Sequence, residues 1–241
     1  MLTWEQLLLD KDDLWKTFHL NSRIPSWCSE KKINKEILIN IPPIHLSFEE
    51  KIDTPLGEVL MKRESSRKIS KASINLKLLS RLLINSYCIR DNKEHPVRTA
   101  PSAGALFPIE IYFHCNLTKE YPEFLPGIYY YCPDSLTITR YTNNMSQPIM
   151  DRILLQKELA NSTLLFFLVA NFSKPTAKYG ERGYRFTLLE AGHIAQNFNL
   201  VATALGMSCV NIGGYSEEDA NHLLNIDGLI SSVVYMFSIN F

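Results

Sequence analysis

The sequence carries no excess charge of either sign, since 25 lysines and arginines balance 25 aspartates and glutamates. A balanced chain has no general field that would attract nucleic acid or an anionic membrane surface. The longest clean apolar run, Leu164 to Ala170, is far shorter than the ~20 residues that a membrane-spanning helix needs. We therefore expect no nucleic-acid partner and no membrane partner.

Cysteine is scarce, and its spacing shows no pairing motif. Five cysteines are an odd number, and no two stand as Cys-x-x-Cys, so the sequence favours neither a zinc site nor a disulfide framework. The N-terminal residues lack the basic stretch and apolar run of a secretory signal. We therefore expect a cytoplasmic protein without a metal, in which the thiols stay reduced. The cysteines are Cys28, Cys88, Cys115, Cys132 and Cys209.

What is present is an ordinary globular composition, with 46% apolar and 21% charged residues in 241. This length can bury a sizeable core. Residues 1–59 are predicted to form a lead segment, with a short helix near Trp4 to Phe18 and then an extended arm. The arm follows from the two prolines in 41–44, which exclude a helix there. Residues 60–241 are predicted to form the main domain.

Within that domain, hydrophobic spacing and turn chemistry alternate between helix and strand. This order predicts an α+β fold with a mixed central sheet flanked by helices. The expected elements are a helix over 73–87, a strand over 109–115, a hairpin of 127–131 with 136–141, a buried strand over 164–172 and a last strand over 231–241.

The helix expected from Phe186 to Leu205 is apolar or small nearly all round. Such a helix is predicted to be buried on every side, at the centre of a domain or at a subunit interface. Gly206 stands where a C-terminal capping glycine would be. Ser216 precedes three acidic residues and is expected to be the N-cap of the next helix.

The first candidate site is Arg63-Glu64-Ser65-Ser66-Arg67. Two guanidinium groups and the hydroxyls between them can bind a phosphate through charge-assisted hydrogen bonds. A solvated basic turn is the alternative. The second candidate is the stretch from Arg98 to Pro108, whose small residues Ser102, Ala103 and Gly104 would let the backbone lie against a flat ligand. A tight connecting loop is the alternative there.

The third candidate is the run from Lys178 to Arg185, which directly precedes the apolar helix. A lysine can act as a base where its charge is disfavoured, and a tyrosine can relay a proton. A charged loop capping the helix is the alternative. Within the helix, the amide of Asn197 needs a partner if it is buried. The paired glycines Gly213 and Gly214 permit a close backbone approach.

Taken together, the order and spacing of these motifs resemble the nitroreductase superfamily, and within it the SagB-type thiazole/oxazole-forming peptide dehydrogenases. The resemblance covers roughly residues 60–241. The Pro-Ser-Ala-Gly-Ala and Lys-Tyr-Gly…Arg-Gly-Tyr-Arg pieces are characteristic of this branch. The matching segments are 63–67, 98–110, 127–131, 178–186, 189–197 and 213–215.

The resemblance implies a homodimer that binds FMN at the subunit interface. It assigns the FMN phosphate and ribityl region to the first motif, and the isoalloxazine ring to the second motif with the paired glycines. It also places Asn197 in the pocket. The implied FMN-binding residues are Arg63, Ser65, Arg67, Ser102, Ala103, Gly104, Asn197, Gly213 and Gly214.

The family's reaction oxidises azolines, which are thiazolines or oxazolines, to azoles in a ribosomally made precursor peptide. The resemblance makes Lys178 the base and Tyr179 a proton relay or a hydrogen-bond donor to the substrate. It implies a cyclodehydratase complex as partner and dioxygen as the electron acceptor. Lysine has an ordinary pKa near ~10.4, so this role requires an environment that disfavours its charge.

Two other functions remain open on the same residues. One is an NAD(P)H-dependent nitro- or quinone-reductase, in which the Lys178-Tyr179 pair would lack a clear purpose. The other is a non-catalytic scaffold subunit of a peptide-modifying complex, against which the complete pair argues.

Overall fold

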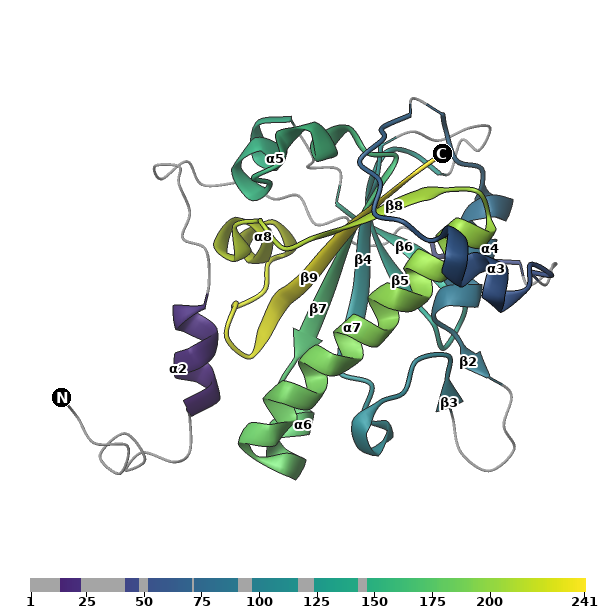
Figure 1. Ribbon diagram of the computed structural model, residues 1–241. Helices are drawn as coiled ribbons and strands as arrows, with labels where there is room; N and C mark the ends of the chain where they lie inside the picture. Colours follow the sequence, from purple (N-terminus) through teal and green to yellow (C-terminus); the bar gives the residue numbers. More distant parts are fainter. Residues whose placement is uncertain are drawn as a thin grey trace.

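The computed structural model describes residues 14–22, 42–47, 52–70, 72–90, 97–116, 124–142 and 147–241. Within these ranges, seven strands form one sheet in the order β1-β6-β5-β4-β7-β9-β8 (Figure 1), and β2 (Ile89–Arg90) pairs with β3 (Val97–Arg98). Neighbouring strands of the large sheet run antiparallel. A parallel bridge between Ser65 and Cys209 adds to the β8 edge, so the sheet is mixed, as predicted. Its strands are β1 (Ile44–His45), β4 (Ile109–Cys115), β5 (Gly127–Cys132), β6 (Thr137–Thr142), β7 (Leu164–Asn171), β8 (Ser208–Ile212) and β9 (Ser231–Asn240).

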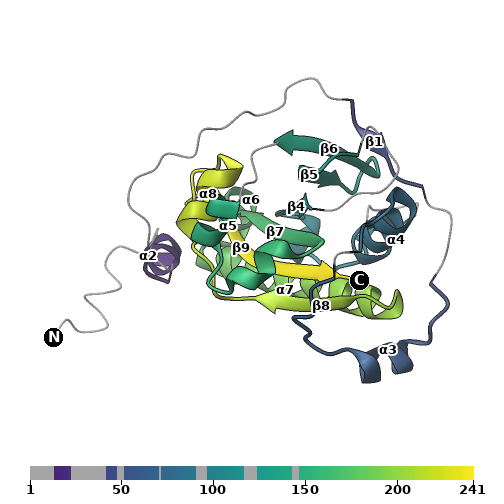
Figure 2. The ribbon, with the colours of Figure 1, turned by 90° about the horizontal axis from the view of Figure 1, so that it is seen from above.

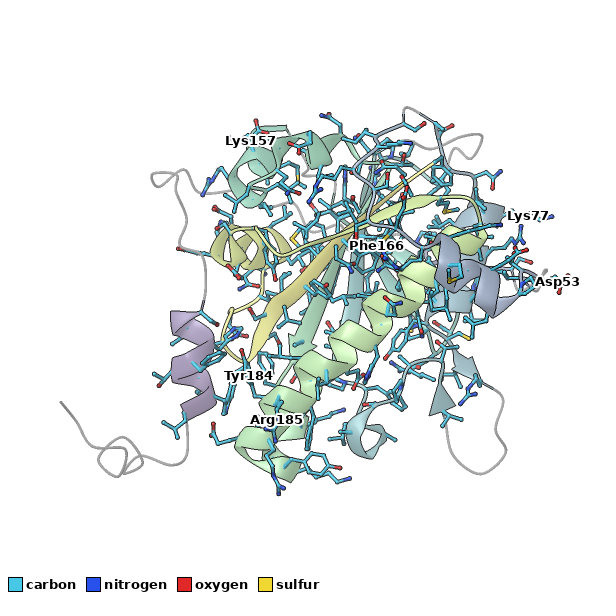
Figure 3. The ribbon with its side chains drawn as sticks, in the orientation of Figure 1. Asp53, Lys77, Lys157, Phe166, Tyr184 and Arg185 are labelled. Carbon is cyan, nitrogen blue, oxygen red and sulfur yellow. The ribbon has the colours of Figure 1, made fainter. Side chains whose placement is uncertain are left out.

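Helices cover both faces of the sheet, and β7 shows the consequence. Alternate side chains of β7 enter two separate cores, so nearly the whole strand is buried. Phe166, at the centre of Figure 3, packs with α4 and α7, whereas Phe167 packs with α5 and α8. Figure 2 shows α4 and α8 on opposite sides of the central strands. The helices are α2 (Leu14–Asn21), α3 (Leu56–Lys62), α4 (Leu76–Ser86), α5 (Gln147–Ile153), α6 (Ser173–Tyr179), α7 (Glu181–Ala204) and α8 (Glu217–Leu224).

Most of the locally encoded elements are confirmed. The helix expected over 73–87 is α4, which begins after Asn75, whose side chain accepts a hydrogen bond from Leu78 N–H at 2.8 Å. The hairpin is β5 with β6, and the buried strand is β7. Ser216 is the N-cap of α8, as predicted, and accepts from Asp219 N–H at 3.2 Å.

The apolar helix differs from its prediction in two respects. It begins at Glu181, five residues earlier than expected, because the polar residues before Phe186 form its first turn. The expectation that it is buried on every side is wrong for a single chain. It lies across one face of the sheet, so the opposite side, which includes Leu189, remains exposed. Gly206 follows the helix with a φ of 74°, as expected of a capping glycine.

The lead segment contributes α2, β1 and the start of α3 to the fold. α2 packs against the start of α7, where Trp15 and His19 contact Tyr184 (Figure 3). β1 extends the sheet by pairing with β6. The part of the predicted first helix before residue 14, and Cys28, lie outside the described residues. The four described cysteines are free thiols, and no helix among the described residues is long and apolar enough to cross a membrane.

Candidate active site

The first part of the site is the turn between β3 and β4, around the short 3-10 helix η1 (Ala103–Ala105). Gly104, Ala105 and Phe107 have positive φ angles of 62°, 54° and 47°. This left-handed region is costly for residues that carry a side chain. Ser102 helps to close the turn, because its hydroxyl accepts a hydrogen bond from Phe107 N–H at 2.9 Å. Strained turns persist where the surrounding structure holds them.

The second part is the junction of α6 and α7. Lys178 and Tyr179 form the end of α6, and Gly180 then breaks the helix with φ 58° and ψ −144°, a conformation almost restricted to glycine. The helices approach closely, because a Cβ on Gly183 would lie 2.6 Å from the backbone nitrogen of Thr176. The alternative of a charged loop is therefore wrong. Lys178 and Tyr179 are presented by helical backbone.

These two parts meet, although 74 residues separate Gly104 from Lys178. A Cβ on Gly104 would lie 2.6 Å from Lys178 Nζ, and still closer to the hydroxyl of Tyr179. Both distances are far below van der Waals contact, so only glycine leaves room for the two polar groups here. The second and third predicted motifs are thus adjacent within one chain.

The two polar groups differ in their surroundings. Tyr179 is half-buried, with its ring edge-on to Phe186 at a centroid distance of 5.3 Å. Lys178 is exposed in the single chain, and its Nζ lies 5.4 Å from the centre of the Tyr179 ring. An ammonium group and a phenol hydroxyl therefore stand side by side at the rim of the Gly104 turn.

Arg98 fastens the turn to the rest of the domain. Its guanidinium donates to the Tyr87 hydroxyl at 2.8 Å and to a carboxylate oxygen of Asp134 at 2.6 Å. The same group stacks over the ring of Phe107 at 4.5 Å. The guanidinium group is planar and carries several N–H donors, so it can contact all of these partners at once, whereas a lysine ammonium lacks this geometry.

Glu190 lies behind the turn and was missed as a site residue. It is only 3% exposed, although it is charged in its ordinary state. Burial raises its pKa from 4.5 to about 7, against the opposing effects of a hydrogen bond with Ser102 and the charge of Arg98. A single acid in an apolar helix was the available signal, but helical spacing alone does not identify the loop that it faces.

Asn197 lies about two helical turns beyond Glu190 on α7. Its amide nitrogen donates to the backbone carbonyl of Ser86 at 3.1 Å and to that of Thr99 at 3.3 Å. These bonds hold the end of α4 and the strand before the turn against α7. The half-buried amide of Asn197 therefore has backbone carbonyls as its partners.

The remaining predicted residues gather at the β8 edge. Ser65 bridges Cys209, and Arg67 Nε donates to the side-chain oxygen of Gln156 at 3.4 Å. The neighbouring backbone of Leu155 donates to the carbonyl of Gly214 at 3.2 Å. The segments 63–67 and 213–214 thus meet through residues 155–156. Arg63 is half-buried here, while Gly213 faces open space.

The site residues therefore form two groups within one chain. The turn group is Ser102, Gly104, Lys178, Tyr179 and Glu190, and the edge group is Arg63, Ser65, Arg67, Gly213 and Gly214. No hydrogen bond or ion pair joins the two groups in the described part of the chain. Figure 1 places α6, which carries Lys178, at the opposite end of the molecule from α5, which leads to residues 155–156.

Comparison with known proteins agrees with this architecture. The Nitroreductase family model matches residues 60–239. The nitroreductase-named protein MJ1384 of Methanocaldococcus jannaschii is 33% identical over 172 residues, which cover 71% of this chain and 84% of that protein. The microcin B17-processing protein McbC of Escherichia coli is 27% identical over 220 residues, which cover 86% of this chain and 76% of McbC.

Solved structures share the fold at lower identity. The match to the E. coli microcin synthetase McbBCD complex with truncated pro-MccB17 has a TM-score of 0.66 and 21% identity, and covers 100% of this chain and 98% of that one. A nitroreductase-type protein of Desulfovibrio desulfuricans in complex with FMN has a TM-score of 0.53 and 14% identity, with 78% and 86% covered. The resemblance seen in the motifs is confirmed: the chain belongs to the nitroreductase family of oxidoreductases.

Proposed function

We propose that the chain is an FMN-dependent dehydrogenase that oxidises thiazolines or oxazolines in a ribosomally made peptide to thiazoles or oxazoles. The observation that carries the proposal is the contact of Gly104 with Lys178 and Tyr179. This contact brings the Gly104 turn, which we expect to face the flavin ring, next to Lys178 and Tyr179, which we expect to transfer the proton. The similarity to McbC, which is named a microcin B17-processing protein, supports a peptide as substrate.

The described residues suit FMN in character. Arg63 and Arg67, with the hydroxyl of Ser65, offer cations and a donor for a phosphate. The backbone at Gly104 has no side chain, and Gly213 faces open space, so a flat ring can approach both. Ser102 and Ala103 lie beside Gly104 in the turn, and Gly214 follows Gly213. Asn197, bound to backbone carbonyls, would support the pocket from behind.

The reaction removes two hydrogens from an azoline ring, one as a proton and one as a hydride. Bound FMN would supply the electron sink for the hydride. Lys178 would accept the proton, and the Tyr179 hydroxyl beside it would orient the ring or relay the proton. A lysine loses its charge most readily where water is excluded. The peptide, the cofactor or a second subunit must therefore cover the exposed Lys178 side chain.

A homodimer accounts for the separation of the turn group and the edge group, because a flavin between two copies can touch one group from each. Exposed apolar side chains are available for that contact. Leu189 is 55% exposed on α7, and Met61 is 88% exposed on the neighbouring α3. The proposal includes a cyclodehydratase complex that delivers the azoline peptide, and dioxygen as the final electron acceptor.

The test is to load the purified protein with FMN and incubate it with a synthetic peptide that contains one thiazoline. We expect a mass loss of about two daltons per ring, because two hydrogens leave. Lys178→Ala should abolish the change. Lys174→Ala, at an exposed lysine of the same helix, should not.

Other results identify the alternatives. An intact peptide, together with rapid bleaching of the flavin by NAD(P)H and its recovery with a nitroaromatic compound, would make the protein a nitro- or quinone-reductase. Protein that takes up no FMN would make it a scaffold subunit.

A further inference from the structure

Residues 152–156, which we call the strap, run from the end of α5 to the short 3-10 helix η2 (Lys157–Asn161). The strap lies along the segment 213–219, which leads from β8 to α8. The two are joined by an ion pair of 2.5 Å with a buried carboxylate, an antiparallel bridge and two backbone hydrogen bonds. The joined pairs are Arg152 with Asp219, Ile153 with Ser216, Leu154 with Tyr215, and Leu155 with Gly214. The glycines of the edge group are therefore held by the strap.

The strap leaves no room for a side chain at Gly214. A Cβ there would lie 2.8 Å from Leu155 Cδ1, whereas ordinary contact requires about 3.5 Å between heavy atoms. The Leu155 N–H also donates to the Gly214 carbonyl at 3.2 Å. Gly214 thus serves the contact with the strap, and the open space of the edge group lies at Gly213.

Gln156 is the last residue of the strap, and its backbone is fixed on both sides. The contacts with the segment 213–219 reach Leu155, directly before it. On the other side, the Gln156 carbonyl accepts a hydrogen bond from Leu159 N–H at 3.0 Å, and Leu159 is fully buried. Figure 3 labels Lys157, the residue that follows the strap. The half-buried Gln156 side chain therefore starts from a fixed place.

Arg67 is the partner of the Gln156 side chain. The chain just before Arg67 is fixed at the β8 edge, because Ser66 N–H donates to the Cys209 carbonyl at 2.9 Å. Arg67 Nε donates to Gln156 Oε1 at 3.4 Å. The terminal amino groups of Arg67 make no hydrogen bond to another residue in the described part of the chain. A guanidinium held at Nε can still present both terminal amino groups, which suit a phosphate.

We propose that Gln156 is a positioning residue, which acts through Arg67 and directs its terminal amino groups to the phosphate of FMN. The strap then sets the phosphate site relative to Gly213, where we expect the flavin ring. A hydrogen bond of 3.4 Å is weak by itself. Its effect here is preorganisation, because an arginine that is already oriented loses less conformational freedom when the ligand binds. The inference rests on the proposed function in so far as FMN is the cofactor.

The test compares the affinities of Gln156→Ala for FMN and for riboflavin, each followed by quenching of flavin fluorescence. Loss of one hydrogen bond corresponds to a factor of about 3 to 10, so FMN binding should weaken by that factor. Riboflavin lacks the phosphate, so its binding should stay unchanged. Gln156→Met keeps the length of the side chain without the acceptor, and should behave as Gln156→Ala does. Asn161→Ala, at an exposed amide of η2, is the control and should change neither affinity.

The link through Arg67 is tested by a double-variant cycle. Groups that act through one contact show non-additive effects. In the Arg67→Ala background, Gln156→Ala should therefore cause no further loss of FMN affinity. Additive losses, equal losses for FMN and riboflavin, or an unchanged FMN affinity in Gln156→Ala would each overturn the positioning role.

The outcomes distinguish this inference from the proposed function. Phosphate-selective, non-additive losses in a protein that leaves azoline peptides intact would support the role of Gln156 and overturn the azoline dehydrogenase activity. Unmodified protein that takes up no FMN would overturn both.

Discussion

Replacing Gly104 with alanine perturbs the contact on which the proposed function depends. The added Cβ would lie 2.6 Å from Lys178 Nζ and closer still to the Tyr179 hydroxyl. Both atoms are at the ends of flexible side chains, so they can move away without disrupting the helix. The change should therefore displace the reacting groups more than it disturbs the fold.

The expected losses of stability and of rate can both be estimated. Alanine at a φ of 62° costs about 1–2 kcal/mol of folding stability, since the left-handed region is unfavourable for residues with a Cβ. Ordinary contact requires about 3.5 Å between heavy atoms, so Lys178 Nζ must retreat by roughly 1 Å. A displacement of that size at reacting groups costs about 100-fold in rate. We expect a small loss of stability with a large loss of turnover.

The assay compares Gly104→Ala with Gly206→Ala in azoline oxidation and in urea unfolding. Gly206 also has a positive φ, of 74°, but a Cβ there meets nothing within 4 Å. It therefore carries the same backbone penalty without the overlap. Equal turnover in the two variants would refute the reasoning, because the contact with Lys178 and Tyr179 would then have no catalytic consequence.

Three further predictions concern other parts of the chain. Burial lowers the pKa of His114 from 6.5 to about 4, so the unfolded state binds more protons between these values, and stability should fall by about 3 kcal/mol as pH drops through that window. His114→Leu should flatten this dependence in urea unfolding followed against pH, and an unchanged slope would contradict the assignment. Trp15→Ala should lower the free energy of unfolding by about 3 kcal/mol, because Trp15 is buried against Tyr184. An unchanged free energy of unfolding would contradict the packing of α2 against α7. Arg67→Ala should weaken FMN binding about tenfold but leave riboflavin binding unchanged, since riboflavin lacks the phosphate; equal effects on both ligands would remove Arg67 from the phosphate site.

Elements with strong local signals could be predicted from the sequence. The apolar spacing of α4, the turn between β5 and β6, and the Ser216 cap are all encoded within a few residues. The resemblance to a family assigned Gly104 to the flavin ring and Lys178 to catalysis, which implies one active site. Local patterns could not supply that association, because the contact spans 74 residues of sequence.

The remaining features depend on tertiary context. The residues 181–185 resemble a loop in sequence, yet they form the first turn of α7, where Arg182 and Arg185 are exposed and Gly183 and Tyr184 are buried. The apolar composition of α7 does not indicate that one side of the helix is exposed to solvent in a single chain. Glu190 was missed because its burial depends on tertiary packing that helical spacing does not reveal.

In the proposed reaction, bound FMN takes its electrons from an azoline ring. The most direct measurement mixes the FMN-loaded protein with a thiazoline peptide in the absence of oxygen and follows flavin absorbance. We expect bleaching in proportion to the rings converted to thiazole, and recovery of the colour when air is admitted. Flavin that stays oxidised with the peptide but is bleached by NAD(P)H would contradict it.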